Sequence, residues 1–220
     1  MEKINLGVLV SGGGSNLQSI IDSIESGRLD AVIRVVISNV PDVRALERAK
    51  NHHIPAVVID PENFRTREEF DREIVDVLKN HCVDLVIMAG FMRILTPVLL
   101  KAFPMKIMNI HPALLPSFQG LHVQQRAFDY GVKFSGCTVH FADEGVDTGP
   151  IIIQAVVPIY DDDTADTLQK RILKEEHRIY PQAIQFYAEG RLEIDGRKVH
   201  IKNYCTMETP CMHNPPLEKF

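Results

Sequence analysis

The sequence predicts an α/β fold, with a doubly wound, Rossmann-like and mostly parallel sheet that carries an antiparallel C-terminal extension. In the first half, short apolar runs alternate with helical patterns, as in βαβ units. These runs are apolar without interruption, which is typical of parallel strands covered on both faces. In the second half, a run with polar–apolar alternation (135–141) and a further apolar run (151–159) flank a short loop. They indicate the antiparallel extension.

Taken in order, the patterns of the first half predict five strands and four helices. We expect strands over residues 6–10, 32–37, 56–59, 85–88 and 107–109. We expect helices between them over residues 16–26, 43–51, 67–81 and 97–102.

The last part of the fold is one long helix and a hairpin. A run of N-cap residues at 161–164 precedes a helical pattern over 166–189, and Gly190 ends it. A turn at Asp195 and Gly196 then joins two short strands, 192–194 and 198–201.

Composition limits the class of protein. The chain has 220 residues, of which 45% are hydrophobic and 24% charged, as in globular domains. A net charge of −5 gives no basic surface for nucleic acid, and no apolar run reaches the length of a transmembrane helix. We therefore expect the protein to bind small molecules rather than nucleic acid or a membrane. We also expect it to be a monomer or a homodimer.

The first residues are typical of a strand and lack a signal-peptide cleavage site. The four cysteines form no CxxC pair, which favours reduced thiols and a cytoplasmic location. No linker or repeat divides the chain, so residues 1–203 are expected to form a single domain. Residues 204–220 hold three prolines without periodicity, and we interpret them as a mobile tail.

Three polar side chains in apolar surroundings indicate catalysis. Asn109 ends a predicted strand, and if the chain stays extended through His111 the two-residue period puts both on one face; Asp147 lies in the loop after residue 141. An amide and an imidazolium can donate to a developing oxyanion, and a carboxylate can charge the imidazole or relay a proton through water. The set suits acyl or formyl transfer without a metal. The alternative is a turn or core histidine, with Asp147 as a turn former.

A glycine-rich segment after the first predicted strand indicates an anion site. Residues 11–16, Ser-Gly-Gly-Gly-Ser-Asn, open the first helix, where free N–H groups and the helix dipole favour phosphate. Leu17 replaces the last glycine of a dinucleotide motif, and a P-loop lysine is missing. We expect a monophosphate site at Gly13, Gly14, Ser15 and Asn16. The alternative is a glycine turn with Ser15 as the helix N-cap.

Three other sets of residues carry weaker signals. Residues 89–95 follow the fourth predicted strand, where open α/β sheets bind ligands, and their apolar side chains suit a flat heterocycle. His140 shares a strand face with Thr138, and we interpret it as a core histidine rather than a ligand contact. Cys205, Cys211 and His213 lack a fourth ligand and regular spacing, so we expect no metal.

Four motifs in order identify a resemblance. They are Ser-Gly-Gly-Gly-Ser-Asn, Ala-Gly-Phe-Met-Arg-Ile-Leu, Asn-Ile-His-Pro-Ala-Leu-Leu-Pro and Val-Asp-Thr-Gly-Pro-Ile. Together they resemble the folate-dependent phosphoribosylglycinamide formyltransferases, over about residues 4 to 195. The fold implied is the formyltransferase fold. Methionyl-tRNA formyltransferases and formyltetrahydrofolate hydrolases share part of the set, but they carry extra domains for which this length leaves no room.

The resemblance implies formyl transfer from the co-substrate 10-formyltetrahydrofolate to the amine of 5-phosphoribosylglycinamide, in purine (IMP) biosynthesis and without a metal. His111, as imidazolium, and Asn109 would stabilise the oxyanion. Asp147 would raise the pKa of His111 and hold a water that carries the amine proton to the folate nitrogen. The resemblance also assigns Glu176 to the ribose hydroxyls. It assigns the folate to Arg67, Met92, Arg93, Ile94, Leu95 and Asn109.

Two positions depart from the family pattern. Ala113 stands where serine is common, and Gln119 where proline is common, both in the loop after the catalytic strand. They bear on loop rigidity more than on reaction type. Two alternatives remain for the function: a formyltransferase acting on another amine, such as an amino sugar nucleotide, and a non-catalytic phosphate-binding module.

Overall fold

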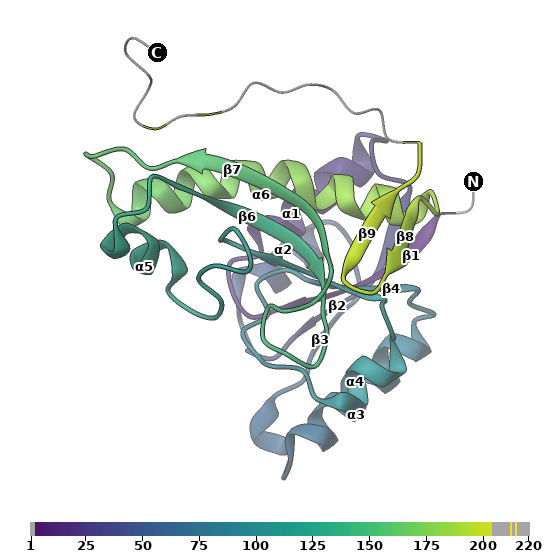
Figure 1. Ribbon diagram of the computed structural model, residues 1–220. Helices are drawn as coiled ribbons and strands as arrows, with labels where there is room; N and C mark the ends of the chain where they lie inside the picture. The colour runs from purple at the N-terminus through teal and green to yellow at the C-terminus, as the bar shows by residue number, and fades with distance from the viewer. Residues whose placement is uncertain (1–2, 204–211, 213, 215–220) are drawn as a thin grey trace.

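The computed structural model describes residues 3–203, Met212 and Asn214. In this part of the chain nine strands form one sheet, in the order β3-β2-β1-β4-β5-β6-β7-β9-β8 (Figure 1). The strands are β1 (Ile4–Val10), β2 (Ala31–Ser38), β3 (Ala56–Val58), β4 (Leu85–Met88), β5 (Ile107–His111), β6 (Phe134–Phe141), β7 (Ile151–Pro158), β8 (Leu192–Asp195) and β9 (Lys198–Ile201).

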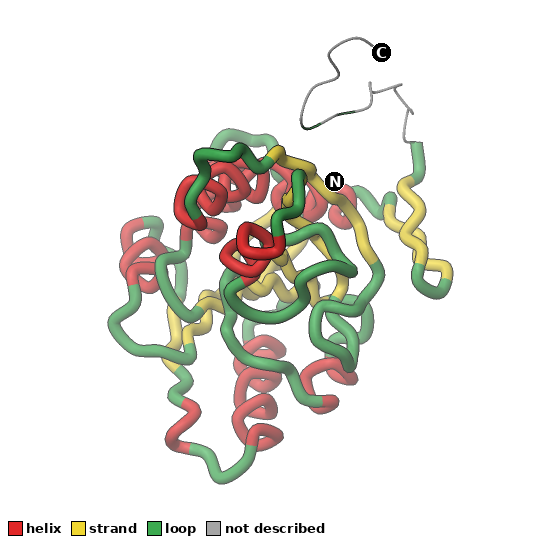
Figure 2. The backbone as a smooth tube through the Cα atoms, turned by 60° about the vertical axis from the view of Figure 1, so that its left-hand side comes forward, coloured by secondary structure: helices red, strands yellow, loops and turns green. Residues whose placement is uncertain are grey.

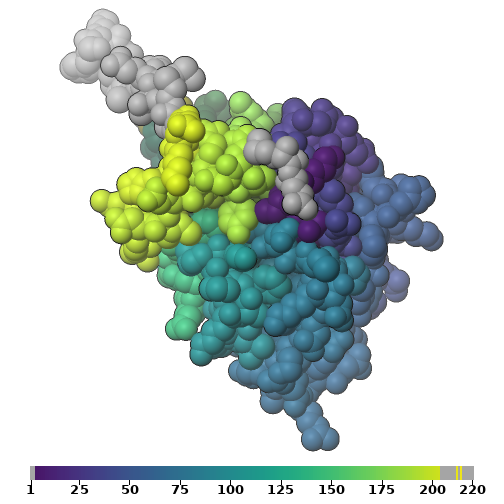
Figure 3. All heavy atoms as spheres, turned by 90° about the vertical axis from the view of Figure 1, so that its right-hand side faces the viewer, coloured from purple at the N-terminus to yellow at the C-terminus, as the bar shows by residue number. Residues whose placement is uncertain are grey.

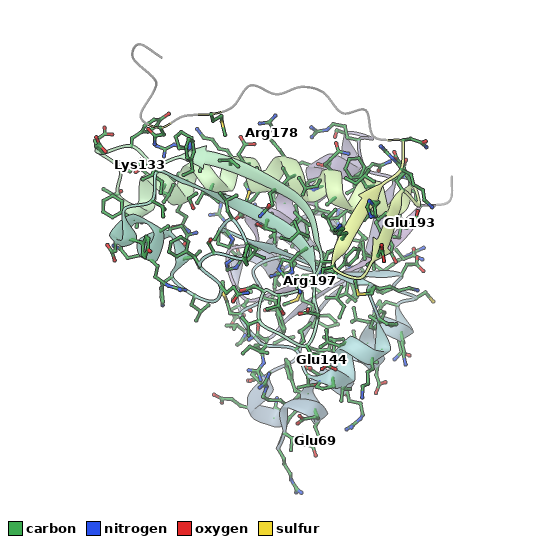
Figure 4. The ribbon with its side chains drawn as sticks, viewed as in Figure 1. Glu69, Lys133, Glu144, Arg178, Glu193 and Arg197 are labelled. Carbon is green, nitrogen blue, oxygen red and sulfur yellow. The ribbon has the colours of Figure 1, made fainter. Side chains whose placement is uncertain are left out.

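Helices cover both faces of the sheet (Figure 2). The outer sides of the two helix layers carry charged residues such as Arg178 on one side and Glu69 on the other (Figure 4). The helices are α1 (Ser15–Glu25), α2 (Arg44–Asn51), α3 (Arg67–Asn80), α4 (Pro97–Ala102), α5 (Val123–Tyr130) and α6 (Ala165–Ala188), with a 3-10 turn η1 (Pro61–Asn63).

The predicted sheet topology is confirmed. Strands β1 to β5 pair in parallel, and β5–β6 and β6–β7 pair antiparallel. The hairpin of β8 and β9 extends the sheet beyond β7 and stands out at the edge of the molecule (Figure 3). The sheet therefore changes from parallel to antiparallel at β5, the strand that carries Asn109 and His111.

Side chains of β1 point alternately into two separate cores, one on each face of the sheet. Leu6 and Val8 pack with the residues of α1, α2 and α6 on one face, whereas Leu9 packs with those of α3 and α4 on the other. All three are fully buried. This double coverage explains why the strands of the first half are apolar throughout.

Tyr180 bridges β4 and β5 from helix α6. Its side chain is fully buried on α6, and its hydroxyl lies 3.1 Å from the carbonyl oxygen of Met88 and 2.9 Å from that of Met108. A buried hydroxyl in reach of both oxygens fixes β4 relative to β5. The loops that leave these strands therefore start from a fixed spacing.

Most predicted elements differ from the structure by one or two residues at their ends. Strand β5 was predicted to end at Asn109 but continues to His111, so both polar residues belong to the regular strand. Helix α5 was not predicted at all. It begins after His122 in the left-handed conformation without a side-chain cap, and its buried residues are Val123 and Ala127. A short helix with so narrow an apolar stripe gives almost no signal.

The described residues form one continuous sheet, and the single domain over 1–203 stays a prediction. Of the tail predicted over 204–220, all but Met212 and Asn214 lies outside the described residues. Among the helices of the described residues, none combines the length and the apolar character that a membrane-spanning helix needs.

Candidate active site

A cavity of about 800 Å³ opens at the carboxyl ends of β1, β4 and β5. This is where open α/β sheets bind ligands, since the strand order reverses between β1 and β4. All the predicted site residues line it except Arg67. Those that do are Gly13, Gly14, Ser15, Asn16, Met92, Arg93, Ile94, Leu95, Asn109, His111, Asp147 and Glu176.

Asp147 brings the predicted catalytic residues together. One carboxylate oxygen, Oδ2, lies 3.3 Å from His111 Nδ1, and the other, Oδ1, lies 3.3 Å from Asn109 Nδ2. The prediction that Asn109 and His111 share a strand face is confirmed. His111 is 4% exposed, so its ring faces the Asp147 carboxylate in a largely buried position.

The loop after β5 holds the Asp147 side chain from the opposite direction. The backbone N–H of Gly120 donates to Asp147 Oδ2 over 2.9 Å, and Gln119 Nε2 donates to the Asp147 carbonyl over 3.2 Å. Asp147 itself has a φ of 54°, the left-handed region that non-glycine residues seldom adopt. These contacts stabilise an unfavourable backbone conformation. Gln119, a departure from the family pattern, is thus part of the support for Asp147.

His111 has one ring nitrogen committed and one facing Asp147. Nε2 lies 2.8 Å from the Phe118 carbonyl oxygen, an acceptor only, so Nε2 carries a proton. Nδ1 is therefore the nitrogen directed at Asp147. Only the doubly protonated ring can donate from that nitrogen.

Burial affects the pKa of His111 more than Asp147 does. Burial lowers the pKa below its ordinary value, and it outweighs the hydrogen bond to Phe118 and the attraction of Asp147, which both raise it. Asp147 does act in the predicted direction. Burial raises the pKa of Asp147, yet the hydrogen bond from Gly120 N and the charge of His111 help to hold it below the usual range.

The phosphate loop leaves the start of α1 open to a ligand. Gly14 is the N-cap residue with a φ of 67° and makes no side-chain cap, so the first N–H groups of α1 are available. The alternative in which Ser15 is the N-cap is wrong. Arg48 Nε donates to the Gly13 carbonyl over 2.9 Å, and Ala45 N donates to that of Gly12 over 3.1 Å. Helix α2 thus supports the loop.

Asn16 and Glu176 form a buried pair at the same end of the cavity. Asn16 Nδ2 donates to Glu176 Oε2 over 2.7 Å, and both residues are more than nine-tenths buried. Burial raises the pKa of the Glu176 carboxyl. One hydrogen of the Asn16 amide is thus engaged with Glu176, and Asn16 retains its backbone N–H and its second amide hydrogen as donors.

The loop between β4 and α4 forms the apolar side of the cavity. Met92 is 68% exposed and Ile94 is 55% exposed, which is high for such side chains. Arg93 stacks over Phe70, outside the apolar surface, at 4.6 Å from the ring centroid. Arg67 is absent from the cavity lining; instead its guanidinium donates to the Ile94 carbonyl. The structure thus places Arg67 behind the loop rather than in the cavity.

Ser11 connects the two loops that line the cavity. Its N–H donates to the Gly90 carbonyl over 3.1 Å, and its hydroxyl accepts from Met92 N over 2.9 Å. The hydroxyl hydrogen goes to Asn39 Oδ1 at the end of β2. Ser11 therefore ties the phosphate loop to the apolar loop.

Several cavity residues were missed by sequence reasoning. His140 was expected in the core, yet it lines the cavity between Asn109 and Asp147. The others lie at the start of α5, in the loop before Asp147 and on α6, where only tertiary folding brings them in. They include Leu121, Gln124, Val146, Gln169 and Leu173. Within the described residues, no cluster of histidine, cysteine or acidic side chains could hold a metal ion.

Comparisons with known proteins identify the family of this chain. Residues 4–184 match the family model described as formyl transferase. Phosphoribosylglycinamide formyltransferase of Haemophilus influenzae is 46% identical over 201 residues, which cover 91% of this chain and 94% of that protein. The crystal structure of glycinamide ribonucleotide transformylase 1 from Symbiobacterium toebii is 50% identical, with a TM-score of 0.90, over 91% of this chain and 94% of that one.

A third relative is much longer. The trifunctional purine biosynthetic protein adenosine-3 of Drosophila melanogaster is 48% identical over 185 residues, 83% of this chain. The chain spans only 14% of the length of that protein. It therefore corresponds to a single part of the trifunctional relative.

The chain belongs to the formyl transferase family, the class of protein that the fold and the site define. Its full-length relatives are phosphoribosylglycinamide formyltransferases, so the predicted resemblance is confirmed.

The contact between His111 and Asp147 generates a testable prediction. Replacing Asp147 by asparagine removes the negative charge that favours the imidazolium, so the pKa of His111 should fall further below its ordinary value. At any given pH the charged fraction of His111 is then smaller, and the upper limb of a pH–rate profile moves to lower pH. Histidine titration by NMR in wild type and Asp147→Asn measures this. An unchanged His111 titration would mean that Asp147 is not its electrostatic partner.

Proposed function

We propose that the chain transfers the formyl group of 10-formyltetrahydrofolate to the amine of 5-phosphoribosylglycinamide, a step of purine biosynthesis. The observation that carries the proposal is the convergence of Asn109, His111 and Asp147 in one cavity. That cavity has an anion-binding helix start at one side and an apolar loop at the other. A phosphorylated amine and a flat heterocyclic donor fit these two sides.

The chemistry begins with attack by the neutral amine on the formyl carbon. A new bond forms from the amine nitrogen to that carbon, and the formyl oxygen becomes an oxyanion. His111, charged and donating from Nδ1, and Asn109, donating from its amide, stabilise the oxyanion in a site shielded from water. Collapse breaks the bond from the carbon to the folate nitrogen, with no covalent bond to the protein.

Asp147 has two roles in this scheme. Its carboxylate stabilises the charged form of His111, which burial alone would disfavour. It also holds a water that takes the amine proton and delivers a proton to the departing folate nitrogen. The depressed pKa of Asp147 keeps the carboxylate ionised for both roles.

The remaining residues bind the two substrates. The N–H groups of Gly13, Gly14, Ser15 and Asn16 bind the phosphate, and Glu176 binds the ribose hydroxyls. Met92 to Leu95 bind the folate ring against exposed apolar side chains. Arg67 supports that loop from behind through the Ile94 carbonyl.

The wider setting follows from the same proposal. Residues 1–203 act as a single formyltransferase domain on small molecules in the cytoplasm, as a monomer or homodimer, with no metal in the reaction. The continuous sheet of the described residues supports the single domain.

A panel of acceptors tests the substrate. The purified chain is given 10-formyltetrahydrofolate with phosphoribosylglycinamide, with an amino sugar nucleotide, or with no amine, and formylated product is measured. We expect product with phosphoribosylglycinamide alone. Transfer to the sugar amine instead would assign the chain to the alternative formyltransferase. Binding of both ligands without transfer would favour a non-catalytic module.

The catalytic assignment predicts a large effect at His111. Replacing His111 by alanine removes the charged oxyanion donor, so turnover should fall by at least about 10²-fold. The strand should still form, because Ile107, Met108 and Ile110 supply its buried apolar side chains. Steady-state kinetics measures the loss, and circular dichroism checks the fold. Near-full activity in folded His111→Ala would rule out the mechanism.

The phosphate loop predicts selective loss of one ligand. A side chain at Gly14 would place its Cβ 2.7 Å from the Cβ of Ala45, in a backbone conformation with a φ of 67°. Gly14→Val should therefore weaken binding of phosphoribosylglycinamide at least about 10-fold, since each tenfold step needs only ~1.4 kcal/mol. Tetrahydrofolate binding should remain nearly unchanged.

Gly27→Val is a matched control for Gly14→Val. Gly27 also has a positive φ, 72°, but a Cβ there meets nothing within 4 Å, and Gly27 is outside the cavity lining. Calorimetry with each ligand should show both affinities preserved in this control. Equal losses of both affinities in Gly14→Val would contradict the assignment of the phosphate site.

A further inference from the structure

His140 is the cross-strand neighbour of Asn109. In the antiparallel pairing of β5 with β6, Asn109 stands opposite His140 and His111 opposite Thr138. Directly opposed side chains in such a pair point the same way and lie within reach of each other. His140 is 2% exposed and lines the cavity. Its position is therefore fixed by the sheet rather than by a mobile loop.

The hydrogen bonds of the His140 ring define where its proton sits. Nδ1 lies 2.8 Å from the carbonyl oxygen of Phe141, which can only accept, so Nδ1 carries a hydrogen. In the neutral ring Nε2 is then an acceptor. Nε2 lies 3.2 Å from Asn109 Nδ2, within hydrogen-bond distance of that donor. Its separation of 3.6 Å from Asp147 Oδ1 is too long for a hydrogen bond.

Asn109 therefore meets two acceptors at its amide nitrogen. One hydrogen of Nδ2 goes to His140 Nε2 and the other to Asp147 Oδ1, 3.3 Å away. The bond to Asp147 is long, and a developing oxyanion can take that hydrogen instead. The bond to His140 does not compete with the reacting atoms, so it persists during the reaction.

We propose that His140 is a positioning residue that, singly protonated on Nδ1, keeps the amide nitrogen of Asn109 directed at the reacting centre. This inference rests on the proposed function. Without the Nε2 acceptor the amide can turn by half a rotation and present its oxygen to the oxyanion, where two negative ends repel. In a ring protonated on both nitrogens, Nε2 would also be a donor. It would then favour the amide oxygen of Asn109 as its partner instead of the amide nitrogen.

Three variants test this role by kinetics. His140→Leu removes the acceptor, and kcat should fall about 10-fold, less than loss of a whole oxyanion donor, while KM for both substrates is unchanged. His140→Gln keeps an acceptor oxygen and should recover part of the loss. His81→Leu is the matched control: His81 also bonds a backbone carbonyl through Nδ1, over 2.8 Å, but is outside the cavity lining, so kcat should be unchanged.

A double-mutant cycle separates positioning from a merely structural role. If His140 acts through Asn109, then His140→Leu should cause no further loss of kcat in an Asn109→Ala background. A loss of the same size in both backgrounds would overturn the proposal. A rise in KM for both substrates with unchanged kcat would overturn it as well.

A measurement without catalysis completes the test. NMR of the ¹⁵N-labelled full chain reports the tautomer of each histidine, assigned by comparison with His140→Gln. A neutral ring protonated on Nδ1 supports the proposal, and a ring protonated on Nε2 or on both nitrogens at neutral pH overturns it. This result stands even if His140→Leu does not fold. If the wild-type chain transferred no formyl group, the proposed function would fail, whereas the tautomer would still decide the orientation of Asn109.

Discussion

The ionised carboxylate of Asp147 is the interaction on which the site depends. Its two oxygens contact His111 and Asn109 from one strand and the N–H of Gly120 from the next loop. Each of these neighbours is held in place by a group elsewhere: the ring of His111 by the Phe118 carbonyl, and the amide of Asn109 by His140. A charge that is largely buried is stable only with such partners. Removal of that one charge would therefore loosen both the strand side and the loop side of the cavity.

Most of the fold could be predicted because its signals are local. Continuous apolar runs gave the parallel strands, and the threonine and aspartate run before α6 marked its start, where Thr164 and Thr167 form a capping box. Helix α5 could not be predicted, since it starts without a side-chain cap and buries Val123 and Ala127 as the two contacts of a narrow stripe. The helix depends on packing against the rest of the protein, and this packing cannot be predicted from the sequence of one segment.

The parts of the site that follow from the two-residue period of a strand could be predicted. The parts that depend on the pairing register between strands could not. The two-residue period put Asn109 and His111 on one face, and the glycines marked the start of α1. The pairing of Asn109 with His140 depends on how two strands slide past each other, which no local pattern specifies. The pKa of His111 illustrates the same limit: the sequence offers the carboxylate partner, whereas the burial that outweighs it comes from the whole fold. Arg67 was assigned from the family pattern, but here its side chain is used to hold the Ile94 carbonyl.

Ser11 has a consequence for how this surface can change over evolution. The N–H and hydroxyl of Ser11 form hydrogen bonds to the apolar loop, and Ser11 itself belongs to the phosphate loop. The two substrate-binding surfaces are therefore connected through this one residue. A substitution that shifts Gly90 or Met92 to suit a different donor is transmitted directly to the segment that holds the acceptor. Donor and acceptor preferences are thus tied together, so this protein would exchange one partner molecule only by adjusting to both.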